Sequence, residues 1–167
     1  MNTNYGKRDI LIFPKFSNIN KIQEIRNKYD PLANLIAPHI TIAFPFSDNM
    51  SNEELIEELS NLLILFKPFT IVFKGVSLSE ENYIFLNCIQ GRQKLIDLHN
   101  EIYKQILPSH FQNSVKYVPH ITLGKSNNIS NLDLFEHEFK TIVDEISIEL
   151  IGKHEESIII KTIKLGG

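Results

Sequence analysis

Two short stretches of this sequence are near copies of each other and constrain the fold more than any other feature. Residues 38–43 read PHITIA, and residues 119–124 read PHITLG. Side chains alternate between the two faces of a strand, so the histidine and the threonine of each copy would share one face. These side chains are His39 and Thr41 in the first copy and His120 and Thr122 in the second. Each copy therefore predicts a strand with one functional face.

A proline opens each of these two motifs. Proline has no N–H to give to a sheet ladder, and it keeps the preceding residue extended. Pro38 and Pro119 therefore suit the first position of a strand. Each histidine is then expected at the start of its strand, at equivalent places in the two halves of the chain.

The paired motifs resemble the signature of a known superfamily. Two His-x-Thr-x motifs with apolar x positions, about half a chain apart, are similar to those of the two-histidine (2H) phosphoesterases. The longer context of the first motif, residues 29–46 with Tyr-Asp-Pro at its start and Phe-Pro-Phe at its end, is similar to the 2′-5′ RNA ligase-like branch. The resemblance implies an α+β fold in which two pseudo-symmetric lobes of antiparallel β-sheet face each other across a central cleft, with helices packed outside.

Composition is compatible with one domain over residues 1–167 that contains an internal pseudo-repeat. The chain is 43% hydrophobic and has no low-complexity tail, which favours a sizeable core. Its formal net charge is −3 and its pI about 6.1, whereas binding of duplex DNA requires many cationic contacts to phosphates. We therefore expect no duplex DNA partner, and a small or terminal phosphate as the ligand.

The single cysteine and the N-terminal segment bear on the cellular compartment. Cys88 has no partner for an intramolecular disulfide, and its apolar strand predicts a buried thiol in a reducing compartment. The apolar run at residues 10–13 is too short for a signal-peptide core or a membrane span. We expect a cytoplasmic monomer that has no contact with a membrane.

Hydrophobic periodicity predicts the order of the remaining elements. Besides the two motifs, the alternating segments that predict strands are residues 9–16, 69–76, 83–89, 146–150 and 158–165. The segments with helical spacing are residues 19–29, 51–66, 95–106 and 130–140. Ser51 and Glu54 form a capping box for the second of these helices. Neighbouring strands joined by hairpins, with helices interspersed, indicate an α+β domain rather than a doubly wound parallel sheet.

A pair of histidines suits acid–base chemistry on a phosphodiester. With a reference pKa of about 6.5, one ring can be neutral and the other protonated near neutral pH, as in-line catalysis requires. Each threonine would lie about 6.5 Å along the strand from its histidine, within reach of a non-bridging phosphate oxygen. By resemblance, His39 and His120 are the acid–base pair, and Thr41 and Thr122 bind the phosphate. The sequence leaves open which histidine is the base.

Two other interpretations of the histidines compete with this one. An isolated histidine at a strand start is more often structural, but two in matched motifs with a threonine favour function. A metal site would need further ligands, and the other histidines show none of the usual ligand spacings. These are His99, His110, His137 and His154. We therefore expect neither a metal nor a cofactor, and no nucleotide-binding glycine loop or serine-hydrolase elbow is present.

Residues beside the motifs are candidates for substrate binding. Phe44 and Phe46 follow the first motif and Tyr117 precedes the second, so their rings could stack on a nucleobase. Core packing is the competing role for the two phenylalanines. Lys125 follows the second motif and could neutralise the phosphate, although a solvated lysine at a strand end is equally compatible with its place.

The sequence thus predicts a metal-independent phosphodiesterase that opens 2′,3′-cyclic phosphates on RNA ends or small nucleotides. Ligation to a 2′-5′ bond would be the reverse reaction, since a stabilised transition state serves both directions. Two alternatives stay open: an enzyme acting on 2′-5′-linked or cyclic oligonucleotide signals, and a non-catalytic module that binds RNA ends or phosphate. Intact copies of both motifs favour an enzyme, because a binding module does not need two titratable groups.

Overall fold

The computed structural model describes residues 5–130, 132 and 136–166. Its strands are β1 (Lys7–Ile12), β2 (Ile40–Phe46), β3 (Phe69–Leu78), β4 (Tyr83–Gln90), β5 (His120–Lys125), β6 (Phe139–Val143), β7 (Glu145–Ile151) and β8 (Ser157–Lys164). Its helices are α1 (Asn20–Tyr29), α2 (Asn52–Leu63), α3 (Arg92–Gln105) and the 3₁₀ helix η1 (Pro108–His110). None of the helices in this part of the chain has the length and hydropathy needed to cross a bilayer.

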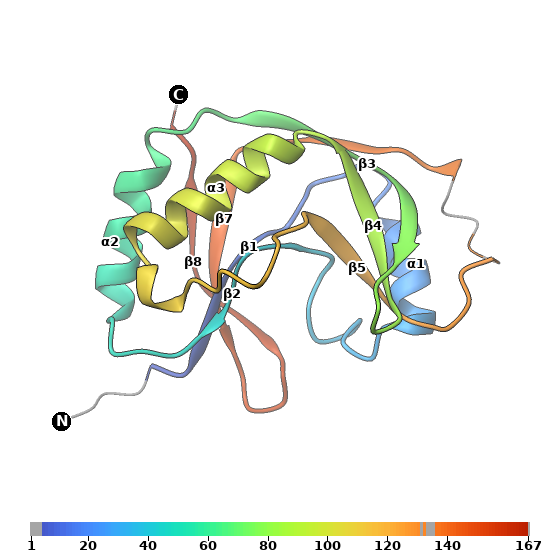
Figure 1. Ribbon diagram of the computed structural model, residues 1–167, viewed down its shortest axis with the longest axis horizontal. Helices are drawn as coiled ribbons and strands as arrows, with labels where there is room; N and C mark the ends of the chain where they lie inside the picture. Colours follow the sequence, from blue (N-terminus) through green and yellow to red (C-terminus); the bar gives the residue numbers. More distant parts are fainter. Residues whose placement is uncertain (1–4, 131, 133–135, 167) are drawn as a thin grey trace.

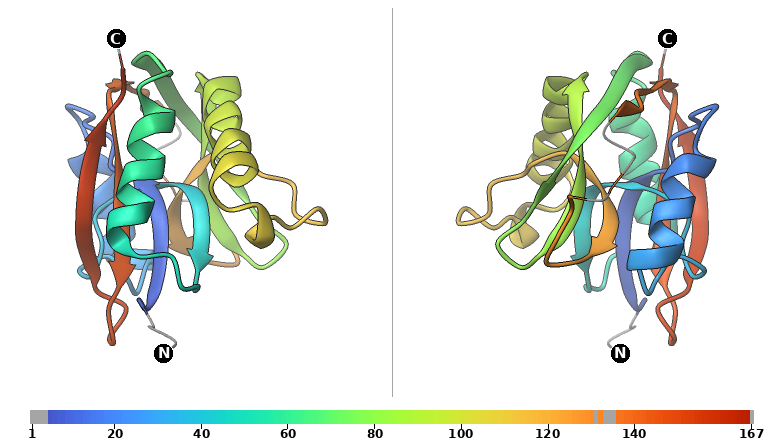
Figure 2. Two further views of the ribbon diagram at one scale, coloured as in Figure 1. Left: turned by 90° about the vertical axis from the view of Figure 1, so that its left-hand side faces the viewer. Right: turned by 90° about the vertical axis from the view of Figure 1, so that its right-hand side faces the viewer.

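The strands form one curled antiparallel sheet in the order β6-β3-β4-β5-β2-β1-β7-β8. Its two halves are the two lobes of the molecule, and the motif strands β5 and β2 lie side by side at the centre (Figure 1). The side views in Figure 2 show β7 and β8 on one side of the molecule and β3 and β4 on the other. One residue pair, Ile40 with Ile121, joins the two halves of the sheet. The predicted α+β fold of two antiparallel lobes is confirmed.

The two lobes are built from the same succession of elements, a strand, a helix and a motif strand. In the first half these are β1, α1 and β2, and in the second half β4, α3 and β5. Each motif strand pairs with the strand that precedes it in its own half. The helices, however, are exchanged: α1 packs on β5, and α3 packs on β2. Each motif strand is therefore supported by a helix from the other half of the chain.

The helices and hairpins form for local reasons that the sequence already shows. Ser51 caps α2 as expected, because its side chain accepts a hydrogen bond of 3.1 Å from the Glu54 N–H. The helix buries four leucines and packs on β8. The hairpins predicted over 69–89 and 146–165 are β3-β4 and β7-β8. Cys88 is buried, which confirms its predicted setting.

The helix predicted over residues 130–140 is wrong at its C-terminal end. Phe139 and Lys140 belong to β6, where Phe139 pairs with Phe73 of β3. The four-residue spacing of the apolar side chains at 135 and 139 suggested a helix, but pairing with β3 decides the conformation. Residues 131 and 133–135 of this prediction lie outside the described residues.

Gly124, at the end of the second motif, allows helix α1 to approach β5. Its φ is +138°, and an added Cβ would lie 2.3 Å from the carbonyl carbon of Tyr29 and 2.4 Å from the carbonyl oxygen. Real Cβ atoms do not approach backbone this closely, so only glycine fits. The corresponding residue of the first motif is Ala43, which shows that the two halves are not supported in the same way.

Replacement of this glycine tests the contact between α1 and β5. We expect Gly124→Ala to lower the free energy of unfolding by about 3 kcal/mol or more, since backbone strain and steric overlap act together. Gly75→Ala is the matched control, because Gly75 also has a positive φ, +82°, but nothing within 4 Å of its Cβ position. That variant should lose only about 1–2 kcal/mol. Urea unfolding measures both, and equal losses would contradict the proposed overlap.

Candidate active site

The two motif histidines are held by the same backbone hydrogen bond. His39 immediately precedes β2 and His120 begins β5. Nδ1 of His39 lies 2.9 Å from the carbonyl oxygen of Ala37, and Nδ1 of His120 lies 2.7 Å from that of Val118. A carbonyl oxygen only accepts hydrogen bonds, so Nδ1 carries the hydrogen in both rings. Nε2 of each neutral ring is therefore left to accept a proton.

The register of β2 and β5 brings the two motifs onto one surface. The single pair that joins the strands is antiparallel. Extending this register by one residue in each direction puts His39 opposite Thr122. It also puts Thr41 opposite His120. Each histidine thus neighbours the threonine of the other motif, and His39 and Thr122 line one pocket.

A β-bulge follows the threonine in each motif strand. The pairing of β1 with β2 passes from Thr41 to Ala43, which leaves Ile42 as an extra residue. The pairing of β4 with β5 passes from Thr122 to Gly124 and leaves Leu123. Bulges next to active sites bend the strand and redirect side chains. Here each bulge comes directly after the histidine and the threonine of its motif.

Burial makes both histidines harder to protonate. For His39, burial lowers the pKa below its ordinary value, and the hydrogen bond to Ala37 opposes this effect. The charges of Arg26 and His120 lower the pKa further, while that of Asp30 raises it. For His120, burial lowers the pKa and the hydrogen bond to Val118 opposes it. Both rings are therefore expected to be neutral near pH 7 in the unliganded protein.

The two histidines differ in their aromatic neighbours. The ring of Phe85 stacks on His120, with centroids 3.6 Å apart and planes at 22°. The ring of Phe13 lies 6.3 Å from His39 and is tilted by 57°. Sequence reasoning missed Phe85, although its place opposite Thr122 follows once residues 83–89 are paired with the second motif. Identical motifs therefore present rings in different surroundings.

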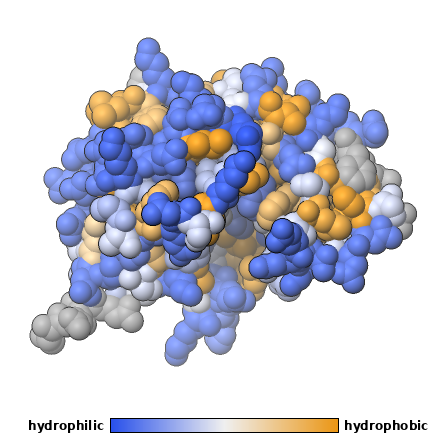
Figure 3. Space-filling view, viewed as in Figure 1, coloured by the Kyte–Doolittle hydropathy of each residue, from blue (hydrophilic) through white to orange (hydrophobic). Residues whose placement is uncertain are grey.

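A pocket of about 390 Å³ opens beside the first histidine. Its lining includes His39, Thr122 and Lys125, as well as Tyr83. The Lys125 ammonium lies 4.9 Å from the centre of the Tyr83 ring. The structure thus brings Lys125 close to the motifs, as expected. Figure 3 shows a mostly hydrophilic face with a hollow near its centre in which apolar side chains are visible.

The three aromatic candidates take different positions. Phe44 is 38% exposed and lies near the first motif. Phe46 is 4% exposed and belongs to the core, so it presents no ring face to a base. Tyr117 is 9% exposed, and its ring stacks on His99 with centroids 3.9 Å apart. Of the three, the structure leaves only Phe44 open to a ligand.

Metal ligands were expected to be absent, and this stays a prediction. Among the residues that the structure describes, no group of three or more histidine, cysteine, aspartate and glutamate side chains is placed to hold a metal ion. The motif side chains themselves can offer proton transfer by two imidazoles and hydrogen bonding by two hydroxyls.

A family model decides where this chain belongs. The model of the 2′-5′ RNA ligase superfamily matches residues 14–148, which contain both motifs. The chain belongs to this superfamily of 2H phosphoesterases. The resemblance inferred from the paired motifs is confirmed.

Relatives of this superfamily match in sequence and in fold. A protein of Oceanobacillus iheyensis, named for phosphoesterase activity, is 30% identical over 146 residues that cover 86% of this chain and 80% of that protein. A similarly named protein of Bacillus cereus is 29% identical over 121 residues, 71% of this chain and 69% of its own. Escherichia coli LigT complexed with 3′-AMP superposes with a TM-score of 0.72 at 20% identity, over 97% of this chain and 99% of LigT. TT0787 of Thermus thermophilus superposes with a TM-score of 0.67 at 14% identity, over 96% of this chain and 98% of TT0787. This phosphoesterase fold is therefore shared with distant proteins.

The state of the two rings can be measured directly. Because burial penalises the charged imidazolium, we expect His39 and His120 to titrate below 6.5, the ordinary value. At pH 7.5 both should be Nδ1–H tautomers. Nitrogen-15 NMR of the ring atoms, assigned with His39→Gln and His120→Gln, reports the pKa and the tautomer. A proton on Nε2 of either neutral ring would contradict the hydrogen bonding described above.

Proposed function

We propose that this protein is a metal-independent phosphodiesterase that opens 2′,3′-cyclic phosphates on RNA ends or small nucleotides. The observation that carries the proposal is the equivalent placement of His39 and His120 where the lobes meet. Each ring is fixed through Nδ1, keeps Nε2 for proton transfer and neighbours the threonine of the other motif.

The reaction needs one proton removed and one supplied. One neutral imidazole takes a proton from water, and the resulting hydroxide attacks phosphorus in line with the ring ester bond. The other imidazole, protonated, gives its proton to the departing ribose oxygen, so the products are a phosphomonoester and a free hydroxyl. Thr41 and Thr122 donate hydrogen bonds to the non-bridging oxygens, where negative charge rearranges in the transition state. With the 5′-hydroxyl of a second RNA as the nucleophile in place of water, the same steps would form a 2′-5′ bond and release the 3′ oxygen as a hydroxyl.

Substrate binding provides the second protonation state. Burial keeps both rings neutral in the free protein, but a bound phosphate diester places a negative charge beside them. An opposite charge within about 4–6 Å raises the pKa of an imidazole. One ring can then take up a proton as the substrate enters, and the mutual repulsion of two imidazolium ions keeps the other neutral.

The pocket chemistry supports a small substrate. Lys125 is the only lysine or arginine among the described residues that line the 390 Å³ pocket, which also contains the carboxylates of Asp30 and Glu155. A pocket with so little positive charge does not suit a long polyanion. LigT, which shares the fold, has been crystallised with 3′-AMP, ATP and NADP⁺, and this supports a nucleotide as the ligand.

Motif variants test the proposal on a nucleoside 2′,3′-cyclic phosphate in the presence of EDTA. His39→Ala and His120→Ala should each lower kcat/KM by about 10²–10⁴-fold, since each removes a proton transfer. Thr41→Ala and Thr122→Ala should cost about 10-fold, because each removes one hydrogen bond among several. Product release is followed by chromatography.

Other outcomes of the same assay point to other functions. Turnover of a 2′-5′ dinucleotide but not of the cyclic phosphate would identify 2′-5′-linked oligonucleotides as the substrate class. Tight binding without turnover, or equal and mild losses in all four variants, would indicate a binding module. Activity that EDTA abolishes and Zn²⁺ or Mg²⁺ restores would replace this scheme with metal catalysis.

The pH dependence tests the division of labour between the two rings. We expect a bell-shaped profile of log kcat/KM, which rises as the base loses its proton and falls as the acid loses its own. Because the rings of the free protein titrate below 6.5, the maximum of the kcat/KM profile should lie below pH 6.5. The kcat profile should lie at higher pH, because the bound phosphate raises the pKa of the imidazoles. A substrate with an acidic leaving group should rescue only the variant that lacks the acid. A flat profile between about pH 5 and 9 would show that neither histidine works in this way.

A further inference from the structure

Beyond the point where the lobes meet, the edge of β2 opposite β1 has no strand beside it. β5 pairs with β2 at Ile40 only and begins at His120, which the register puts opposite Thr41. Beyond Thr41, β5 therefore supplies no partner for β2. The backbone groups on this edge need other hydrogen-bond partners, since an unpaired one is costly.

Three side chains replace the missing strand. The hydroxyl of Tyr117 donates a hydrogen bond of 2.8 Å to the carbonyl oxygen of Thr41. Nδ1 of His99 donates one of 2.8 Å to the carbonyl oxygen of Ile42. The hydroxyl of Tyr103 accepts one of 3.0 Å from the N–H of Phe44. His99 and Tyr103 come from α3, and Tyr117 comes from the connection between α3 and β5.

These three rings form a packed layer. Tyr117 and His99 stack with their planes at 3°, and the centroids of His99 and Tyr103 are 4.8 Å apart. All three residues are buried. Burial lowers the pKa of His99, so its ring stays neutral while it donates to the backbone. The hydrogen bonds to β2 therefore come from groups whose positions are fixed by packing rather than from mobile surface side chains.

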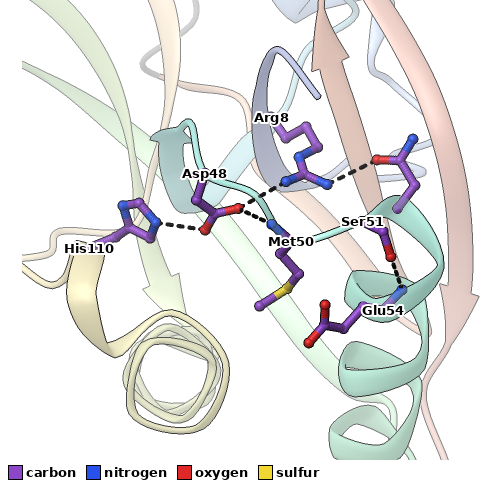
Figure 4. A network of polar contacts seen from close by, with 7 residues as sticks. Arg8, Asp48, Met50, Ser51, Glu54 and His110 are labelled. Atoms are coloured by element: carbon purple, nitrogen blue, oxygen red, sulfur yellow. Dashed lines mark hydrogen bonds and ion pairs between the residues drawn. The ribbon is translucent and has the colours of Figure 1, made fainter. Parts of the chain in front are cut away.

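The segment that carries Tyr117 is anchored at its other end as well. His110 of η1 points toward Asp48, with 2.8 Å between Nε2 and Oδ2 (Figure 4). Asp48 is held in turn by the guanidinium of Arg8 at 3.1 Å and by the N–H of Met50 at 3.0 Å (Figure 4). Arg8 is fully buried. The connection from α3 to β5 is thus tied to the first lobe at both His110 and Tyr117.

We propose that Tyr117 is a positioning residue for Thr41, and the proposal rests on the role given to Thr41 in phosphate binding. The bulge after Thr41 interrupts the ladder to β1, and β5 extends no further along β2 than Thr41, so the Tyr117 hydroxyl fixes the carbonyl group of this residue. With the carbonyl group fixed, the Thr41 side chain is aimed at the position of the phosphate. Tyr117 acts through Thr41 and does not touch the reacting atoms.

Tyr103 offers a matched control because it makes the same type of bond to the same strand. Its partner is the N–H of Phe44, three residues beyond Thr41 and on the far side of the bulge. Tyr117→Phe and Tyr103→Phe each delete one buried hydroxyl and keep the ring. Both should lower the melting temperature by a similar amount, since each leaves one backbone group unpaired. Only Tyr117→Phe should affect the phosphate site.

A double-mutant cycle tests the proposal on the diester that the wild-type protein turns over. We expect Tyr117→Phe to lower kcat/KM about 10-fold, through both a lower kcat and a higher KM, and Tyr103→Phe to leave kcat/KM within about twofold. Tyr117→Phe combined with Thr41→Ala should have a kcat/KM no lower than that of Thr41→Ala alone, because the hydroxyl acts through Thr41. Losses that multiply, or an unchanged kcat/KM in Tyr117→Phe, would overturn the proposal.

A binding measurement separates this proposal from the proposed function. If the wild-type protein turns over none of the diesters, the proposed function fails. The same cycle is then measured on the dissociation constant of inorganic phosphate by NMR titration of the wild-type protein and the variants. Weaker binding in Tyr117→Phe that disappears in the Thr41→Ala background supports positioning. Phosphate affinity that is equal in Tyr117→Phe and Tyr103→Phe overturns it, as does the absence of any phosphate binding by the wild type.

Discussion

The single residue pair between Ile40 and Ile121 determines the geometry on which the rest of the structure depends. A longer ladder between β2 and β5 would continue one lobe into the other as an ordinary sheet. With one pair, the two antiparallel strands overlap only at their first residues and then run in opposite directions. The histidines stand at this overlap, and a bulge follows each threonine, at Ile42 and at Leu123. A shared site and two separate lobes thus follow from the same short contact.

Because β2 and β5 overlap so briefly, each of them has a backbone edge that the other does not cover. These two edges are covered in different ways. Side chains of α3 and of the following connection cover the edge of β2, whereas the end of α1 lies directly against Gly124 of β5. The aromatic neighbours of the two histidines differ in the same way, with Phe85 stacked on one ring and Phe13 tilted to the other. A duplicated motif can therefore supply two chemically distinct imidazoles, which a reaction that needs both an acid and a base requires.

The sequence predicts the parts of this structure that depend on local signals. The motif strands, the three long helices and the hairpins follow from periodicity, caps and prolines. β6 could not be found this way, because Phe139 fits a helical spacing and only β3 makes it a strand. Phe46 and Tyr117 stand beside the motifs in sequence, but their burial depends on which elements pack against β2. The role of Tyr117 depends on how far β5 extends along β2, and no local pattern contains that information.

The exchange of helices between the halves has a consequence for how such a chain could have arisen. Neither half buries its helix on its own motif strand, since α1 packs on β5 and α3 on β2. A protein that consisted of one half alone would leave its helix and its sheet without partners, unless two copies exchanged helices in a symmetric dimer. Duplication and fusion of the gene for such a dimer would account for the exchanged helices. The two histidines would then descend from one residue that met its own copy across the dimer axis.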